Sequence, residues 1–240
     1  MNPPLSPSGF TTDAMKSSPR LLASAVGILL ALPVAAQVVQ TYSAMPNLTI
    51  PDNSTVGVAQ TITLPANVVS ITDVTLDLTV TGGFTGDYYA YLEHGSDVAV
   101  LLNRVGRTGS APFGYLDNGL QVTLSDSAAN GDIHTYQTVS NPAGGTLTGT
   151  WAPDGRSVSP FDTVTSDPRT ATLSGLNGQS SGGAWTLFVA DLSAGGVGTL
   201  ANWSLTITGS SVPEPANWAG VTGAVLAILA GTRAAARKGQ

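Results

Sequence analysis

The seven residues from Val74 to Val80 read Val-Thr-Leu-Asp-Leu-Thr-Val, with an apolar residue at every even position and a polar residue between. This period of two is typical of a β-strand that buries one face and exposes the other. Two later segments alternate in the same way. Their apolar members are the residues that we expect to form the structural core: Trp185, Leu187, Val189, Trp203, Leu205 and Ile207.

Further strand candidates surround these three segments, and no stretch between them shows a sustained helical period of apolar residues. Glycine and Asn-Gly pairs separate the candidates, and these residues supply the positive φ angles that tight hairpins require. The pattern predicts an all-β protein, specifically an antiparallel β-sandwich of jelly-roll type. The shorter candidates are residues 60–64, 88–92, 98–102, 120–124 and 145–151.

Composition excludes several classes of function. The 240 residues contain no cysteine, which rules out disulfide scaffolds, thiolate metal sites and cysteine nucleophiles. Residues 37–212 hold thirteen acidic residues, four arginines and no lysine, a formal charge of −9. A surface this acidic repels phosphate backbones, so nucleic acid is not an expected partner.

The N-terminal segment has the three parts of a secretory signal. Lys16 and Arg20 precede a short apolar run over residues 21–32, and small residues follow it up to Ala36. The run is shorter than the ~20 residues that a spanning helix needs. We therefore expect cleavage by a signal peptidase between Ala36 and Gln37. Residues 1–14 fit no part of a signal, so both Met1 and Met15 stay open as the true start.

The C-terminal segment combines a short motif, an apolar stretch and a basic end. The apolar stretch covers residues 218–230 and is followed by three basic residues. By the positive-inside bias the basic end would stay in the cytoplasm, leaving residues 37–212 outside. The motif that precedes the stretch consists of Val212, Pro213, Glu214 and Pro215.

This arrangement resembles the bacterial PEP-CTERM sorting signal. The resemblance implies a C-terminal hydrophobic helix that anchors the chain transiently in the inner membrane. It also implies cutting near the motif by an exosortase-type enzyme, followed by release to the cell surface or the extracellular space.

The segment between the two signals resembles the P domain, also called P/Homo B, of proprotein convertases and bacterial subtilisin-like proteases. The specific part runs from Gly182 through Trp185-Thr186-Leu187 to Asp191, and then from Gly198-Thr199-Leu200 to Trp203-Ser204-Leu205. Looser matches lie at residues 50–53, at residues 74–81 followed by Gly86-Asp87, and at residues 149–153. The resemblance implies a jelly-roll β-sandwich over residues 46–209. Asp191, at a strand end, is expected to accept backbone N–H bonds from the Gly195-Gly196 turn.

These features divide the chain into five expected parts. Residues 1–36 form an N-terminal extension and signal peptide, and residues 37–45 form a linker. The P/Homo B-like sandwich covers residues 46–209. A linker over residues 210–217 carries the sorting motif, and residues 218–240 form the hydrophobic segment with its basic tail.

The sequence contains one motif that is typical of a catalytic serine, and it places no histidine base near that motif. Residues 178–182 satisfy Gly-x-Ser-x-Gly around Ser180, but no helix follows, as a nucleophile elbow requires. The histidines, His94 and His134, lie in separate predicted loops. The motifs of the subtilisin-like catalytic domain are absent. We therefore expect no enzyme activity, no catalytic residues and no cofactor.

Aspartates in predicted loops suit Ca²⁺, which prefers oxygen ligands. No EF-hand spacing is present, and solvated turn aspartates are the expected reading, with a structural Ca²⁺ as the alternative. The residues concerned are Asp87, Asp117, Asp126, Asp132, Asp162 and Asp191.

Aromatic residues offer a second binding chemistry, because their rings stack on sugars. At alternating positions, Tyr89 and Tyr91 are expected to lie half in the core and half on the surface. The full set of aromatic candidates is Tyr88, Tyr89, Tyr91, Phe113 and Tyr115.

The resulting expectation is an exported, non-catalytic structural or interaction module at the cell surface or in the extracellular polysaccharide matrix. Exopolysaccharide and surface proteins are the candidate partners. The alternative is a carbohydrate-binding module. A hydrolase, or an accessory subunit that assists a subtilisin-like protease in trans, ranks below both.

Overall fold

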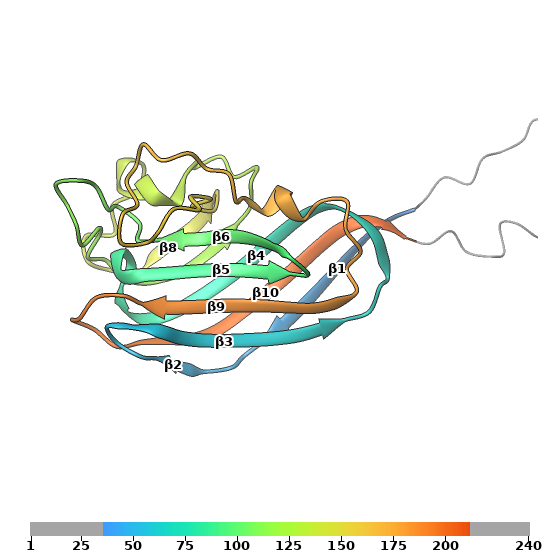
Figure 1. The fold of residues 1–240 in the computed structure, drawn as a ribbon, viewed down its shortest axis with the longest axis horizontal. Coiled ribbons are helices and arrows are strands. Elements are labelled where there is room, and N and C mark those ends of the chain that lie inside the picture. Colours follow the sequence, from blue (N-terminus) through green and yellow to red (C-terminus); the bar gives the residue numbers. More distant parts are fainter. Residues whose placement is uncertain (1–35, 212–240) are drawn as a thin grey trace, which may run out of the picture. The chain divides into compact units, whose positions relative to one another are not determined.

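The computed structural model describes residues 36–211, which form ten strands and three short 3₁₀ helices (Figure 1). Within this range no helix has the length and apolar character needed to cross a membrane. The predicted signal peptide and C-terminal hydrophobic segment lie outside the described residues. In chain order the elements are β1 (Gln37–Ala44), β2 (Leu48–Ile50), β3 (Ser54–Leu64), β4 (Val68–Phe84), η1 (Thr85–Asp87), β5 (Tyr88–His94), β6 (Asp97–Asn103), β7 (Asn118–Leu124), η2 (Ile133–Thr138), β8 (Leu147–Trp151), η3 (Leu173–Leu176), β9 (Gly183–Asp191) and β10 (Gly198–Ser211).

The strands form two sheets, which we call sheet A and sheet B. Sheet A has the order β1-β10-β4-β7-β8, with β2 paired to the remaining length of β10. Sheet B has the order β3-β9-β5-β6 and lies in front of sheet A in the view of Figure 1. The prediction of an all-β fold is confirmed.

One strand pair departs from the predicted antiparallel arrangement, because β7 and β8 run parallel. A parallel pair needs a long crossover connection between its strands. Residues 125–146, which include η2, provide that connection. Every other strand pair in the two sheets is antiparallel.

The alternating segment that indicated the fold lies in the middle of β4. Its even-numbered residues are fully or almost fully buried, whereas Thr75 is partly exposed and Asp77 is exposed on the outer face of sheet A. Asp77 accepts hydrogen bonds from Thr123 Oγ1 (2.6 Å) and Ser204 Oγ (2.7 Å), which belong to the two flanking strands. The polar face of β4 therefore ties neighbouring strands together, while its apolar face supplies the core.

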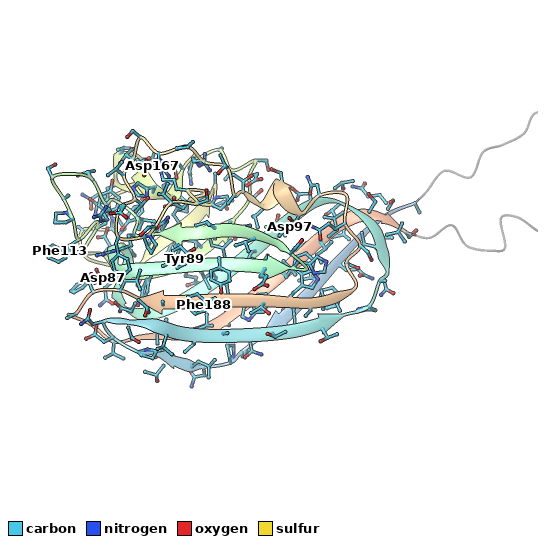
Figure 2. The ribbon with its side chains drawn as sticks, in the orientation of Figure 1. Asp87, Tyr89, Asp97, Phe113, Asp167 and Phe188 are labelled. Carbon is cyan, nitrogen blue, oxygen red and sulfur yellow. The ribbon has the colours of Figure 1, made fainter. Side chains whose placement is uncertain are left out.

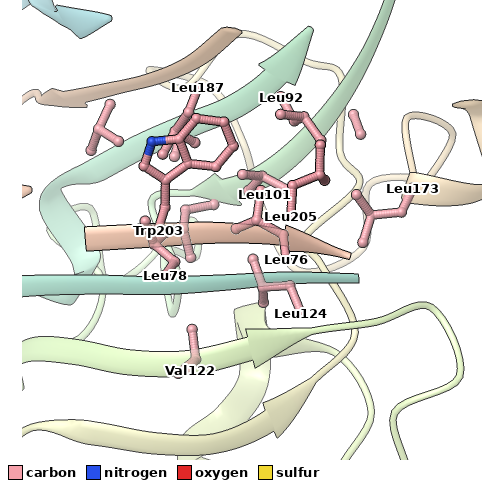
Figure 3. Close-up of a cluster of buried hydrophobic side chains, with 14 of the residues drawn as sticks. Leu76, Leu78, Leu92, Leu101, Val122, Leu124, Leu173, Leu187, Trp203 and Leu205 are labelled. Atoms are coloured by element: carbon pink, nitrogen blue, oxygen red, sulfur yellow. The ribbon is translucent and has the colours of Figure 1, made fainter. Parts of the chain in front are cut away.

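The core between the sheets contains three fully buried indole rings, those of Trp151, Trp185 and Trp203. Figure 3 shows Trp203 from sheet A among leucines of both sheets, including Leu187 and Leu92 of sheet B. An indole that removes about 200 Å² from water contributes about 5 kcal/mol of transfer free energy. All six residues expected to form the core are buried, each exposed by 1% or less.

The predicted linker over residues 37–45 is wrong, because residues 37–44 form strand β1. This strand pairs with β10 along its whole length, from Gln37 opposite Ser210 to Ala44 opposite Trp203. Alternate residues of β1 are partly buried, and Val38, Tyr42 and Ala44 pack against the core. This burial stabilises the strand in the sheet. The sandwich therefore begins before residue 46, and β10 continues to Ser211, past the predicted boundary at residue 209.

Candidate functional site

The Gly-x-Ser-x-Gly loop, residues 178–182, lies beside His94 in the fold. The backbone carbonyl oxygen of Ser180 is 2.8 Å from His94 Nε2, and the carbonyl oxygen of Ala184 is 3.0 Å from His94 Nδ1. The imidazole stacks on Trp185, with ring centroids 3.9 Å apart and planes 7° from parallel. Both ring nitrogens of His94 thus face carbonyl oxygens, and neither faces a hydroxyl group.

The serine hydroxyls of this loop bond to the backbone. Ser180 Oγ donates to Val68 O (3.3 Å), and the buried Ser181 Oγ donates to Pro65 O (2.9 Å). An activated nucleophile needs its hydroxyl hydrogen-bonded to a base. It also needs, in this motif, a strained turn from a strand into a helix, whereas strand β9 follows Gly182 directly. The geometry fits a connecting loop rather than a nucleophile elbow.

The other histidine lies in a buried polar network. His134 Nδ1 is 2.7 Å from Asp154 Oδ2, and its Nε2 is 3.0 Å from the carbonyl oxygen of Arg107. Arg156 donates to Asp154 Oδ1 (3.1 Å) and to Asp132 Oδ2 (2.8 Å). His134 and Asp154 are fully buried. The network holds the crossover that contains η2 against the loop after β8, which is a structural role.

All four arginines of the described residues form hydrogen bonds with loop residues of the protein itself. Arg107 donates to the carbonyl oxygens of Thr163 and Phe161, and Arg169 donates to those of Asp154 (3.0 Å) and Pro153 (2.6 Å). Because these cations are engaged with the protein's own backbone and carboxylates, they leave the outer surface dominated by acidic and neutral side chains. The same engagement leaves no arginine cluster in the described residues to bind an anionic ligand.

A second buried polar cluster lies at the ends of β5 and β9. Arg104 donates to Ser193 Oγ (2.6 Å) and to Gly86 O (3.1 Å), and its Nη2 lies 3.5 Å from Asp87 Oδ1. Asp191 is fully buried, and its Oδ2 has no hydrogen-bond partner among the described residues. Burial, together with the charges of Asp87 and Asp52, raises the pKa of Asp191 to about 7. Burial also raises the pKa of Asp87 above its usual value.

The predicted partner of Asp191 is wrong. Its Oδ1 accepts the N–H of Ser193 (3.3 Å), two residues along the chain, as an Asx turn would arrange. The N–H of Gly195 instead faces Asp52 Oδ2, at 3.5 Å. The strand-end carboxylate therefore closes a turn over residues 191–193, which is shorter than expected and does not include the glycine pair.

The aspartates considered as Ca²⁺ ligands are mostly engaged by protein donors. Asp117 accepts from Tyr136, Gln137 and the N–H of Gly144, while Asp126 accepts two backbone N–H groups at the start of η3. Asp162 is exposed. Over residues 36–211, no three histidine or acidic side chains are grouped as a metal site would require.

The predicted processing residues fall at the edge of the described range. Gln37 is the first residue of β1, and the carbonyl oxygen of Ala36 accepts the N–H of Ser211 at 3.0 Å. The sorting motif at residues 212–215 lies just outside the described residues. The two ends of the sandwich are thus adjacent in space at neighbouring strands of sheet A.

The aromatic candidates separate into buried and partly exposed residues. Tyr88 is fully buried and donates to Gly82 O (2.7 Å), so it is not available for stacking on a sugar. Tyr89 and Tyr91 both lie partly exposed on the outer face of sheet B, rather than divided between core and surface. Phe113 is exposed, whereas Tyr115 packs edge-on against Tyr136.

Sequence reasoning missed one member of this outer face. Phe188 lies on β9 directly opposite Tyr91, and Figure 2 shows Phe188 and Tyr89 on neighbouring strands of the sheet turned to the viewer. The alternation of Trp185, Leu187 and Val189 into the core already implied that Phe188 points outward. The pairing with Tyr91 depends on the register of β5 and β9, which local sequence does not specify.

The architecture and contacts define an all-β sandwich. Its buried polar groups stabilise the loops through hydrogen bonds and ion pairs. No family model matches the chain, and no curated protein matches it. Solved structures that resemble it include the serine protease of Aeromonas sobria and the same protease in complex with the chaperone ORF2. The identity is 15% for both. The match covers 75% of this chain for the complex (TM-score 0.41) and 74% for the protease alone (TM-score 0.40). It spans 28% of the length of each of those chains.

Proposed function

We propose that this chain is an exported, non-catalytic β-sandwich of the P/Homo B type. Its C-terminal PEP-CTERM tail sorts it to the cell surface or the polysaccharide matrix, where it acts by binding. The partners during export are a signal peptidase and an exosortase-type enzyme. The anchor in the inner membrane is transient.

The observation that carries this proposal is the placement of the first and last described residues of the sandwich, which lie next to each other. One sandwich fills the interval between the predicted signal cleavage after Ala36 and the predicted sorting motif at Val212. Gln37 pairs with Ser210, so both flanking segments leave the domain at the same end of sheet A. A domain built this way folds as one unit while its C-terminal tail is held in the membrane.

The contacts of Ser180 and the two histidines support a non-catalytic role. The hydroxyl of Ser180 bonds to a backbone oxygen, and the ring nitrogens of His94 and His134 are taken up by carbonyl oxygens and a buried carboxylate. A general base needs a ring nitrogen within reach of the proton that it removes from substrate. Here these groups stabilise loops instead.

A carbohydrate-binding role is the second candidate, and the partly exposed rings of Tyr89, Tyr91 and Phe188 favour it. Aromatic side chains on a rigid sheet present apolar faces to a ligand at low cost in conformational entropy. This role is compatible with export and sorting, because it specifies what the module binds after release.

Replacing both prolines of the sorting motif tests the proposal. In a host that contains an exosortase-type enzyme, the chain carrying Pro213→Ala and Pro215→Ala is expected to remain uncut in the inner-membrane fraction. The unchanged chain is expected in shortened form at the cell surface or in the matrix. Immunoblots of the two fractions measure the difference, with Pro168→Ala in an exposed loop as the matched control. Identical processing and fractionation of both chains would refute the tail assignment.

A further inference from the structure

Three aromatic side chains form a continuous patch on the outer face of sheet B. Along β5, Tyr88, Ala90 and Leu92 point into the core, and the residues between them point outward. Phe188 on β9 is directly opposite Tyr91 in the register. We call Tyr89, Tyr91 and Phe188 the aromatic platform.

The rings of the platform lie next to one another along β5 and across to β9. Tyr91 and Phe188 stack with centroids 4.9 Å apart and planes 20° from parallel, and Tyr89 lies 6.0 Å from Tyr91 at 57°. Gly57 on β3 extends the surface, because a Cβ at that position would lie 2.6 Å from Phe188 Cζ. The Phe188 ring therefore reaches over the glycine, and the apolar surface crosses three strands.

A carboxylate and a recess adjoin the platform at the other end of β5. Glu93, two residues beyond Tyr91, makes no hydrogen bond or ion pair within residues 36–211. It lines a cavity of about 200 Å³ together with His94 and Thr186 and with the small residues Gly95, Gly182, Gly183 and Ala184. The His94 nitrogens face carbonyl oxygens, and Thr186 Oγ1 lies 2.8 Å from Thr61 Oγ1. Glu93 is therefore the charged group that the recess offers to a ligand.

The distribution of charged side chains around the recess favours a ligand with a positive charge. The four arginines of the described residues are hydrogen-bonded within loops, and none lines the recess. Asp97, at the start of β6, is the next acidic residue along the chain and accepts from Gln179. An anionic ligand would meet uncompensated carboxylates here, whereas a cation would gain both a carboxylate and ring faces.

We propose that this face binds a polysaccharide that carries free amino groups. The apolar C–H faces of pyranose rings would stack on the platform, and an ammonium group would pair with Glu93 at the recess. The proposal deepens the binding role given above, and rests on it, by naming the surface and the ligand class. A purely structural reading, in which the rings only cover Gly57 and brace the sheet, predicts no ligand at all.

Isothermal titration of the full-length chain in mild detergent tests the proposal with two oligosaccharides of equal length. The probes are the hexamer of glucosamine and its fully N-acetylated counterpart, in mildly acidic buffer where the amines are protonated. We expect the amino hexamer to bind at least about fivefold more tightly than the acetylated one, which is the size of effect that a cation beside aromatic rings supports. The Tyr91→Ala and Glu93→Gln variants are each expected to weaken binding by about fivefold or more. Thr123→Ala, on the outer face of sheet A, is the matched control and should bind like the unchanged chain.

Several outcomes would overturn the proposal. One is the absence of binding, and another is equal affinity for the two hexamers. A third is unaltered binding by Tyr91→Ala and Glu93→Gln variants whose melting temperatures show that they are folded. Competition by oligolysine with the same dependence on Tyr91 and Glu93 would assign the surface to a basic protein instead. None of these results would affect the export and sorting proposal, which depends on where the chain is found.

Discussion

Replacing Asp154 by alanine is expected to lower the free energy of unfolding by about 3–5 kcal/mol, the cost of breaking a buried ion pair from one side. Asp154 accepts from Arg156, His134 and the backbone N–H of Asn103, and it is fully buried. Its removal leaves the Arg156 guanidinium with only Asp132 as a charged partner. Because domains are stable by about 5–15 kcal/mol, the loss is a large part of the total.

Urea denaturation followed by tryptophan fluorescence measures this effect. Asp154→Asn, which keeps the shape but not the charge, provides a second and milder variant if the alanine variant does not fold. Asp97→Asn is the matched control, because Asp97 is exposed and bonds only to Gln179; its effect is expected within about 0.5 kcal/mol. A change below about 1 kcal/mol for both Asp154 variants would contradict a structural role for the network.

Stability is expected to fall as the pH rises from about 4 to about 7, because of Asp191. Its pKa in the folded protein is raised to about 7 from an ordinary value of 3.8, so the folded state keeps a proton that the unfolded state has already lost. The stabilisation is therefore complete at low pH and is lost through this window. Three pKa units correspond to about 4 kcal/mol, as an upper bound. The raised pKa of Asp87 acts in the same direction.

Asp191→Asn removes the titrating group while keeping a neutral side chain of the same shape. The variant is expected to be more stable than the unchanged chain above pH 7, and its stability should vary less between pH 4 and 7. Urea midpoints measured across this range provide the comparison. Lower stability of the variant at pH 8 would mean that the ionised carboxylate of Asp191 has a favourable partner in the folded protein.

Alternation of apolar and polar residues was sufficient to predict the central strands of both sheets. The side-chain period of two applies locally, so Val74 to Val80 and the two tryptophan-centred segments identified their strands without knowledge of their partners. Strand β1 was predicted as a linker because its alternating residues follow the predicted signal peptide directly. It is recognisable as a strand only through its pairing with β10.

The buried polar networks could not be predicted, because they join residues far apart in the sequence. Arg104 meets Asp87 and Ser193, and Arg156 meets Asp132, only after the sheets and crossover loops are in place. The aromatic platform also could not be predicted, because it too joins residues that are far apart in the sequence. The outward direction of Phe188 follows from alternation, but its contact with Tyr91 requires the register between β5 and β9.

The central claim about this protein is that the polar groups of the sandwich stabilise its fold and do not take part in covalent chemistry. A fluorophosphonate probe, which modifies activated serines, tests this claim most directly when applied to the full-length chain and to its Ser180→Ala variant. We expect both chains to show the same background labelling, while a known serine hydrolase in the same reaction is labelled fully. Near-stoichiometric labelling of the unchanged chain that disappears in the Ser180→Ala variant would contradict the account.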